Sequence, residues 1–101
     1  MSRFTFDTDV RADLDAIWDY IAVENQSPVA ASNQIEVLYD KFSLLATQPF
    51  LGEAREDLGK NVRMFVVRPY VILYRPKDHG IKVAQVVHSA QDIYAVFRHK
   101  G

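Results

Sequence analysis

One pair of residues has the types and spacing of a catalytic couple. His88 is followed four positions later by Asp92, and a carboxylate beside an imidazole fixes which ring nitrogen carries the proton. Such a pair can act in general acid–base catalysis. A structural hydrogen bond that closes the end of a strand is the simpler interpretation of the same two residues. We therefore treat His88 and Asp92 as candidates for a functional surface.

Arginines and tyrosines recur through the second half of the chain. Such a mixture can bind RNA, because guanidinium groups contact phosphates and aromatic rings stack on bases. The same side chains can instead lie along an apolar sheet surface with only their charged ends in water. Both interpretations stay open for Arg63, Arg68, Arg75 and Arg98, together with Tyr70, Tyr74 and Tyr94.

Several kinds of site are excluded because the necessary residues are missing. An EF-hand loop that starts at Asp7 would need glycine and glutamate where the chain has Ala12 and Trp18. The acids in this region suit the positive end of a helix better than a metal ion. The chain has no nucleophile elbow, no P-loop, no dinucleotide-binding glycine pattern and no cysteine. We expect neither a metal nor a cofactor.

Length, composition and charge limit the class of protein. The chain has 101 residues, of which 49% are hydrophobic and 25% charged, and this predicts one folded domain over residues 1–101. No run approaches the roughly 18 apolar residues of a membrane span. Residues 1–9 lack the apolar core of a signal peptide. Because a chain without cysteine also fits a reducing compartment, we expect a cytoplasmic protein that does not bind a membrane.

Charge is divided unevenly between the two halves of the chain. Residues 1–50 carry three Lys or Arg against eight Asp or Glu, whereas residues 51–101 carry nine against five. This asymmetry suggests that the second half meets an anionic partner. Two solvated faces of opposite charge would give the same numbers.

The first half of the chain predicts a strand and two helices. Alternating apolar residues indicate a strand over residues 3–6, and an apolar stripe with helical spacing indicates a helix from Val10 to about residue 24. Thr8 or Asp9 is expected to cap this helix.

A second helix is expected to start at Ser27-Pro28, because proline at the first helical position loses no hydrogen bond, and to end before Pro49. The short link between the two helices predicts an antiparallel helical hairpin.

The second half predicts a small antiparallel sheet. Three β-rich runs, at residues 62–67, 70–75 and 81–88, are joined by short turns, and this is the pattern of a meander. A two-residue turn at Arg68-Pro69 would set Val67 opposite Tyr70, so that alternate residues point to opposite faces. Both faces are then largely apolar.

A helical hairpin can cover only one of these two faces. Residues 91–98 predict a short helix or an irregular tail, which could shield the second face. Otherwise that face would be covered by a partner, which is the interpretation we favour.

These features together resemble a ParE-type toxin of the RelE/ParE superfamily from bacterial type II toxin–antitoxin modules. The resemblance covers most of the chain, and although each motif is degenerate, their order and spacing together are fairly specific. The matching positions are Asp13-Leu14, Ile17, Tyr20-Ile21, Phe42, Leu45, Pro49, Gly52, Arg55, Asp57-Leu58, Arg63, Phe65, Tyr70, Ile72, Tyr74, His88 and Asp92-Ile93.

The resemblance implies an α+β fold with the order β-α-α-β-β-β, in which an N-terminal strand and an antiparallel helical hairpin pack on a small antiparallel sheet. It also implies a cognate ParD-like antitoxin that wraps the toxin in a hetero-oligomer. We expect the antitoxin on the face that the hairpin leaves uncovered, at Val62, Met64, Val66, Val71, Leu73 and Arg75.

Two activities divide the superfamily, because RelE-like members cleave mRNA on the ribosome and ParE-like members poison DNA gyrase. The RelE-like branch uses an arginine beside the tyrosine that opens the third strand, where this chain has Val71, and a basic residue after the fourth strand, where it has Ala90-Gln91. Without a guanidinium, the charge that develops on the scissile phosphate would lose its stabilisation.

These departures favour a non-enzymatic gyrase inhibitor that contacts its target through His88, Asp92 and Arg98. The alternative is a RelE-like, ribosome-dependent mRNA endonuclease that uses Arg63, Arg75 and His88. A non-toxic module that binds only its partner is a third possibility.

Overall fold

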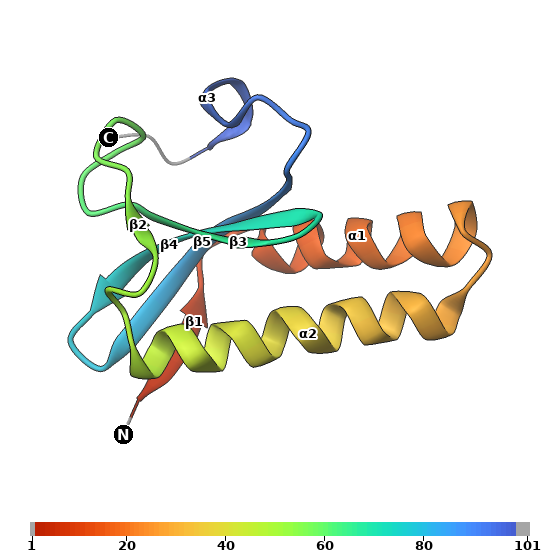
Figure 1. Cartoon of the computed structure of the whole chain (residues 1–101), viewed down its shortest axis with the longest axis horizontal. Coiled ribbons are helices and arrows are strands. Elements are labelled where there is room, and N and C mark those ends of the chain that lie inside the picture. The colour runs from red at the N-terminus through yellow and green to blue at the C-terminus, as the bar shows by residue number, and fades with distance from the viewer. Residues whose placement is uncertain (1, 99–101) are drawn as a thin grey trace.

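The computed structural model describes residues 2–98, and Figure 1 shows two long helices on one side of a sheet. The α+β class, the helical hairpin and the short C-terminal helix are confirmed. The elements are β1 (Arg3–Phe6), α1 (Val10–Glu24), α2 (Pro28–Thr47), β2 (Glu53–Ala54), β3 (Arg63–Val67), β4 (Tyr70–Lys77), β5 (Gly80–His88) and α3 (Ile93–Val96).

Helix α1 buries the predicted stripe but begins without the expected cap. Its buried side chains include Val10, Leu14 and Ile21. Asp9 occupies the N-cap position with a left-handed backbone, φ 77°, and its side chain accepts no capping hydrogen bond. The first turn is closed by the main chain instead, since the Asp13 amide donates to the carbonyl of Asp9 at 3.0 Å. The expected side-chain cap by Thr8 or Asp9 is therefore wrong.

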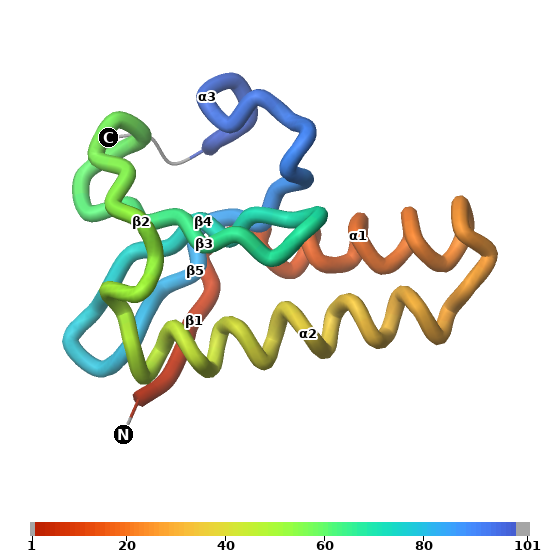
Figure 2. Tube along the Cα trace, in the orientation of Figure 1, coloured from red at the N-terminus to blue at the C-terminus, as the bar shows by residue number. Residues whose placement is uncertain are grey.

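Helix α2 begins as predicted. The Ser27 hydroxyl accepts a hydrogen bond from the Ala30 amide at 3.1 Å, and Pro28 is the first helical residue. The helix ends at Thr47, before Pro49. Figure 2 shows α1 and α2 side by side as an antiparallel hairpin. Among residues 2–98, none of the helices combines the length and the apolarity that a membrane crossing requires.

The sheet has the strand order β1-β5-β4-β3-β2 within the described residues. The predicted meander of β3, β4 and β5 is confirmed, and so is its register, in which Val67 lies opposite Tyr70. Strand β1 runs in the same direction as β5, the last strand of the meander, and the two strands pair in parallel. The sheet is therefore mixed, whereas the sequence predicted an antiparallel one.

Strand β4 is buried on both faces and separates two apolar clusters. On the helical side, Ile72 and Tyr74 pack with Leu38 and Phe42. On the other side, a second cluster is formed by Leu58, Val62, Val71, Leu73, Ala84, Val87 and Phe97, with Met64, Ile93 and Val96 packed against it. Most of both faces is thus covered by the chain itself.

The expectation that the second face stays open for a partner is therefore wrong for most of that face, although Val66 at its β3 end is 46% exposed. The face is covered by the loop that contains Leu58 and by the C-terminal segment, residues 89–98, which includes α3. Figure 1 shows α3 on the opposite side of the sheet from α1 and α2. Of the two alternatives that the sequence left open, shielding by the tail is the one that the fold adopts.

Tyr74 and Arg63 fix the loop that follows α2. The Tyr74 hydroxyl donates to the carbonyl of Pro49 at 2.8 Å and accepts from the Gly52 amide at 2.9 Å. Burial raises the pKa of this phenol. Arg63 donates to the carbonyls of Phe50 and Gly52. These bonds place the short strand β2 beside β3.

Gly80 allows the turn between β4 and β5 to touch β1. Its φ is 144°, and a Cβ at this position would lie 1.7 Å from the carbonyl oxygen of Arg3. Residues other than glycine rarely adopt this φ, and here the clash is with backbone, which cannot rotate away.

We predict that Gly80→Ala lowers the free energy of unfolding by more than about 2 kcal/mol, because β1 must separate from β5 to admit the methyl group. Urea denaturation followed by circular dichroism would measure the loss. His79→Ala, in the same turn and exposed, is the matched control and should change stability by less than about 0.5 kcal/mol. Equal stability of the two variants would contradict the parallel pairing of β1 with β5.

Candidate functional site

The residues expected to contact the target lie where β4 begins and β5 ends. An open groove of about 660 Å³ lies there between α1, the end of β5 and the C-terminal segment. We call it the α1–β5 groove. Helix α1 contributes Ile17 and Tyr20 to its wall, β4 contributes Tyr70, β5 contributes His88, and the C-terminal segment contributes Arg98.

Two side chains close the edge of β5 along this groove. Strand β1 pairs with β5 only as far as Val83, so the later amides on that edge lack a strand partner. The Val86 amide donates to the Asp13 carboxylate at 3.2 Å, and the His88 amide donates to Gln91 Oε1 at 3.1 Å. Unpaired strand edges invite further strands to pair, so these side chains protect the end of β5.

Arg98 connects the C-terminal segment to α1. Its two terminal nitrogens donate to the two carboxylate oxygens of Asp13, at 2.8 and 2.9 Å. This geometry is bidentate and charge-assisted, the strongest common form of a side-chain hydrogen bond. The bonds to Asp13 raise the pKa of Arg98. The expected target residue Arg98 thus lies in the groove with its guanidinium held in a fixed direction.

His88 lies at the mouth of the groove but does not pair with Asp92. Its Nδ1 accepts a hydrogen bond from the Ala90 amide at 3.0 Å, so the neutral ring carries its proton on Nε2. Its ring stands edge-on to Tyr70, with ring centroids 5.5 Å apart. Asp92 instead caps α3, where its Oδ1 accepts from the Tyr94 amide at 3.0 Å. The possible His88–Asp92 couple is not formed, because the turn after β5 directs Asp92 toward the helix.

The two tyrosines of the groove differ in exposure. Tyr70 is buried, and burial raises the pKa of its phenol, with a smaller contribution from the nearby Tyr20. Tyr20 is 59% exposed on the surface of α1. Amphipathic aromatic side chains of this kind are common anchors at protein–protein interfaces. The groove therefore has a fixed aromatic floor and an accessible aromatic rim.

The six residues expected to bind an antitoxin divide into two groups. Val62, Val71 and Leu73 are buried in the second apolar cluster, beneath the chain's own covering segments. Val66 is 46% exposed, and Met64 and Arg75 are half-buried. Only the second group can be touched by a partner without movement of the C-terminal segment or the loop.

The residues of the alternative nuclease site are not brought together. Arg63 lies opposite Tyr74, whereas His88 lies opposite Tyr70, so the two positions are separated by four residues, or about 13 Å, along β4. Strand alternation sends the side chain of Arg75 to the other face of the sheet. There its Nε donates to the carbonyl of Lys60 at 3.0 Å.

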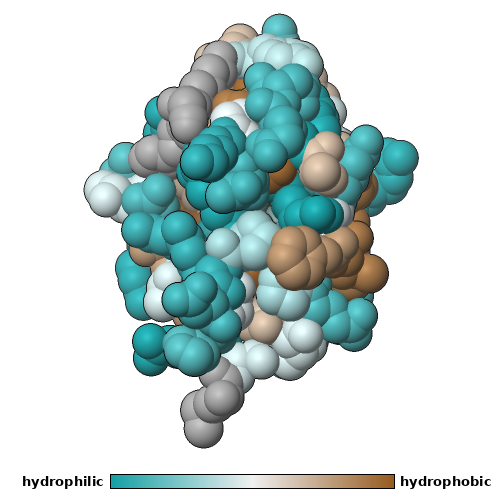
Figure 3. Space-filling model, turned by 90° about the vertical axis from the view of Figure 1, so that its left-hand side faces the viewer, coloured by the Kyte–Doolittle hydropathy of each residue, from teal (hydrophilic) through white to brown (hydrophobic). Residues whose placement is uncertain are grey.

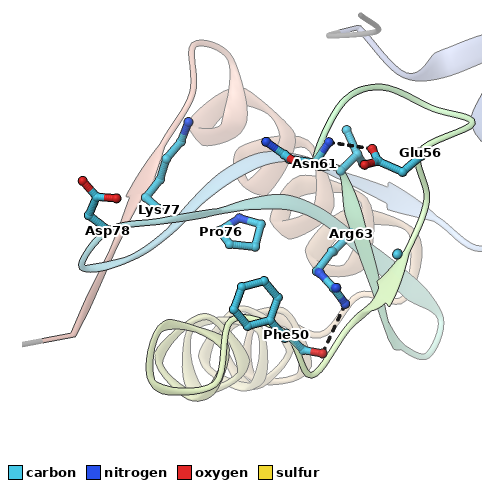
Figure 4. Close-up of a pocket in the computed structure, with 9 residues that line it drawn as sticks. Phe50, Glu56, Asn61, Arg63, Pro76, Lys77 and Asp78 are labelled. Carbon is cyan, nitrogen blue, oxygen red and sulfur yellow. Dashed lines mark hydrogen bonds between the residues drawn. The ribbon is translucent and has the colours of Figure 1, made fainter.

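A second hollow, of about 340 Å³, surrounds Arg63 and is drawn in Figure 4. The Arg63 guanidinium lies 4.9 Å above the ring of Phe50 and donates to the carbonyl of that residue. Lys77 adds a second cation, but Glu56 and Asp78 also line the hollow. Arg63 thus holds a loop in place, and the surroundings are of mixed charge.

The face of the molecule that lies on the left in Figure 1 is mainly hydrophilic, with one small apolar patch in view (Figure 3). In the loop after α2, Phe50 is 72% exposed and Leu51 is also exposed. The exposed ring of Phe50 has a structural role, because it supports the Arg63 guanidinium by a cation–π contact.

A second tether holds the C-terminal segment to the loop that contains Asp57. The Tyr94 hydroxyl donates to the Asp57 carboxylate, which Arg55 also binds through two nitrogens. The hydrogen bonds from Arg55, and then the one from Tyr94, lower the pKa of Asp57. The loop and the C-terminal segment therefore cover the second apolar cluster as one connected layer.

Sequence reasoning missed two residues that organise the groove, Asp13 and Gln85. Asp13 is one of the acids that suit the positive end of a helix, yet it binds Arg98 and the edge of β5. Gln85 is the one polar residue between Val83 and Val87 in an otherwise apolar run. That break in the pattern was the available signal.

Comparisons with known proteins agree on one family. A family model described as the ParE toxin of the type II toxin–antitoxin system parDE matches residues 4–93. Toxin ParE3 of Caulobacter vibrioides is 28% identical over 95 residues, which cover 94% of each chain. A solved structure described as the chromosomal ParDE TA system from P. aeruginosa aligns with a TM-score of 0.69 at 22% identity, over 87% of this chain and 96% of that one. At this identity the structural likeness shows the fold alone.

We predict that Asp13→Asn loosens the C-terminal segment, because the neutral amide cannot form the bidentate pair with Arg98. The free energy of unfolding should fall by about 1–2 kcal/mol, less than for a fully buried pair because Arg98 is partly exposed. Amide hydrogen exchange at residues 96–98 should become faster. Asp15→Asn, on the exposed side of α1, is the matched control. Equal exchange in the two variants would contradict the role given to Asp13.

Proposed function

The chain belongs to the ParE toxin family of type II toxin–antitoxin systems, and from this premise we propose that it acts by binding DNA gyrase rather than by catalysing a reaction. The ParE-like branch of the superfamily is the one that poisons gyrase. We further propose that a ParD-like antitoxin neutralises the protein in a hetero-oligomer, and that both partners meet it in the cytoplasm.

The observation that carries the non-enzymatic proposal is the residue at position 71. The RelE-like branch places an arginine there, whereas Val71 is buried in the second apolar cluster and offers no charge to a phosphate. The second basic position is replaced by Ala90 and Gln91, and Gln91 is engaged on the edge of β5. A nuclease would have to stabilise phosphate charge without these groups.

The separation of the remaining candidates also supports a binding function. Arg63, Arg75 and His88 are divided between two ends and two faces of the sheet, so they cannot meet at one scissile bond. Arg63 and Arg75 are both hydrogen-bonded to main-chain carbonyls of nearby loops. These cations stabilise the fold, and their presence in the sequence does not require RNA as a partner.

We propose the α1–β5 groove as the surface that meets the target. It gathers two of the three residues expected there, His88 and Arg98, and adds the exposed ring of Tyr20. An apolar floor with a polar rim is the usual composition of a protein-binding surface. Asp92 has a different role, since it caps α3.

For the antitoxin, we propose contacts at Met64, Val66 and Arg75. These are the accessible members of the predicted set, and they lie at or near the β2–β3 side of the sheet. Beyond β2, which pairs only with Arg63 and Met64, the outer edge of β3 carries the exposed side chain of Val66. Val62, Val71 and Leu73 belong to the core and are not part of this proposal.

We predict that the purified protein inhibits DNA supercoiling by gyrase and that Tyr20→Ala raises the inhibitory concentration at least about tenfold, the effect of losing a typical aromatic anchor. Lys77→Ala, an exposed change at the opposite end of β4, is the control and should inhibit like the unmodified chain. Circular dichroism would verify that both variants are folded.

The alternative activity is tested in the same preparation. Cleavage of mRNA on ribosomes, without any effect on gyrase, would contradict the proposal and favour a nuclease. In that case His88→Ala should abolish cleavage while the fold is retained.

A further inference from the structure

Apart from the phenols of Tyr70 and Tyr74, Gln85 is the one buried polar side chain among residues 2–98, with 4% of its surface exposed. It lies opposite Leu73 on the face of the sheet that carries the second apolar cluster. A primary amide in such surroundings is costly unless both its donor and its acceptor are satisfied. Its hydrogen bonds therefore indicate why glutamine is present at this position.

Both ends of the Gln85 amide bind the C-terminal segment. Nε2 donates to the carbonyl of Val96 at 2.9 Å, and Oε1 accepts from the Arg98 amide at 2.9 Å. Phe97 lies between these two positions with extended backbone, φ −70° and ψ 122°. In an extended chain, the carbonyl before a residue and the amide after it point in the same direction, so one side-chain amide can bind both.

The C-terminal segment needs such a support. Helix α3 has four residues, far fewer than an isolated helix requires for stability in water. The C-terminal segment contributes to the apolar core mainly through Phe97, which follows α3 and is 4% exposed. The amide of Gln85 fixes the direction of the chain on both sides of Phe97, and so determines where the next side chain, Arg98, emerges.

The position of Arg98 in turn determines the shape of the α1–β5 groove. Val96 and Arg98 form the wall of the groove that faces α1, and Arg98 reaches across to Asp13. The tether from Tyr94 to Asp57 lies on the loop side and does not line the groove. The pair of Arg98 with Asp13 lies in the groove but binds only the side chain of Arg98. Of the three tethers, Gln85 is therefore the one that fixes the main chain of the groove wall.

We propose that Gln85 is a positioning residue for target recognition: by binding the main chain on both sides of Phe97, it presents Val96 and Arg98 as one wall of the α1–β5 groove. This inference rests on the proposed function of the groove. Gln85 acts through the segment that it holds, since its own side chain is almost wholly buried.

The first test compares two variants that each remove one tether. Gln85→Leu keeps the volume and suits the apolar surroundings, so the sheet should fold, while Tyr94→Phe removes only the hydroxyl that binds Asp57. Gln85→Leu should raise the concentration of protein that inhibits gyrase supercoiling at least about tenfold, corresponding to the loss of about one good hydrogen bond. Tyr94→Phe should change it less than about twofold. Amide exchange at residues 96–98 would confirm that the segment is released in Gln85→Leu.

The second test uses pH to restore the lost donor. In Gln85→Glu the ionised side chain cannot donate to the carbonyl of Val96, whereas the protonated carboxyl group can donate there and still accept from the Arg98 amide. Burial raises the pKa of such a carboxyl group. The affinity of Gln85→Glu for immobilised gyrase, divided by that of the unmodified chain at each pH, should therefore rise as the pH falls from about 8 to about 6. A ratio that stays flat would contradict positioning by this hydrogen bond.

The outcomes separate the two proposals. If the unmodified chain inhibits gyrase and Gln85→Leu releases the segment but inhibits equally well, the positioning role is wrong and the proposed function stands. If the unmodified chain does not inhibit gyrase, the proposed function is wrong, and the positioning role in target recognition is wrong with it.

Discussion

Strand β4 is apolar on both of its faces, and this constraint organises the whole molecule. Every residue from Tyr70 to Tyr74 is buried, so the sheet must be covered twice. The α1–α2 hairpin covers one face and buries Ile72 and Tyr74 against Phe42. Within residues 2–98, the second face receives no long helix and is covered by a loop and a four-residue helix. The chain thus covers one face with the helical hairpin and the other with a thin layer, which consists of the loop that contains Leu58 and the C-terminal segment.

The thin layer is held by polar bonds as well as by the apolar contacts of Leu58 and Phe97. Gln85, Asp13 and Asp57 hold the C-terminal segment through Val96, Arg98 and Tyr94, respectively. Such bonds add modest net stability, but they fix geometry. Since the same segment forms a wall of the α1–β5 groove, covering the core and shaping the proposed recognition surface are one structural task.

Most of the polar side chains that suggest chemistry in the sequence have structural partners in the fold. Arg63 binds the loop after α2, Arg75 binds the carbonyl of Lys60, and Asp92 caps α3. Each is engaged with main-chain groups that would otherwise lack a partner at an element end or in a loop. The accessible side chains at the groove include the rings of Tyr20 and His88. Together they favour recognition of a protein surface over transformation of a substrate.

The sequence by itself determined the features that follow from local rules. The spacing of Leu14 and Ile21 placed a helix, Ser27-Pro28 marked the start of the next, and the turn at Arg68-Pro69 set the register of β3 against β4. Period and turn length fix these features within a few residues, so no distant contact is needed to read them. The family resemblance has the same origin, since it depends on the order and spacing of such positions.

Only the tertiary structure decided which residues far apart in the chain meet. Asp13 and Arg98 are 85 positions apart, and no local pattern pairs them. His88 and Asp92 are four positions apart, yet the turn after β5 separates their roles. The covering of the second face depends on a short segment that Gln85, Asp13 and Asp57 hold in place. The partners of the Gln85 amide are main-chain atoms. Main-chain partners leave no signature in side-chain sequence, because every residue offers the same carbonyl and, proline apart, the same amide group.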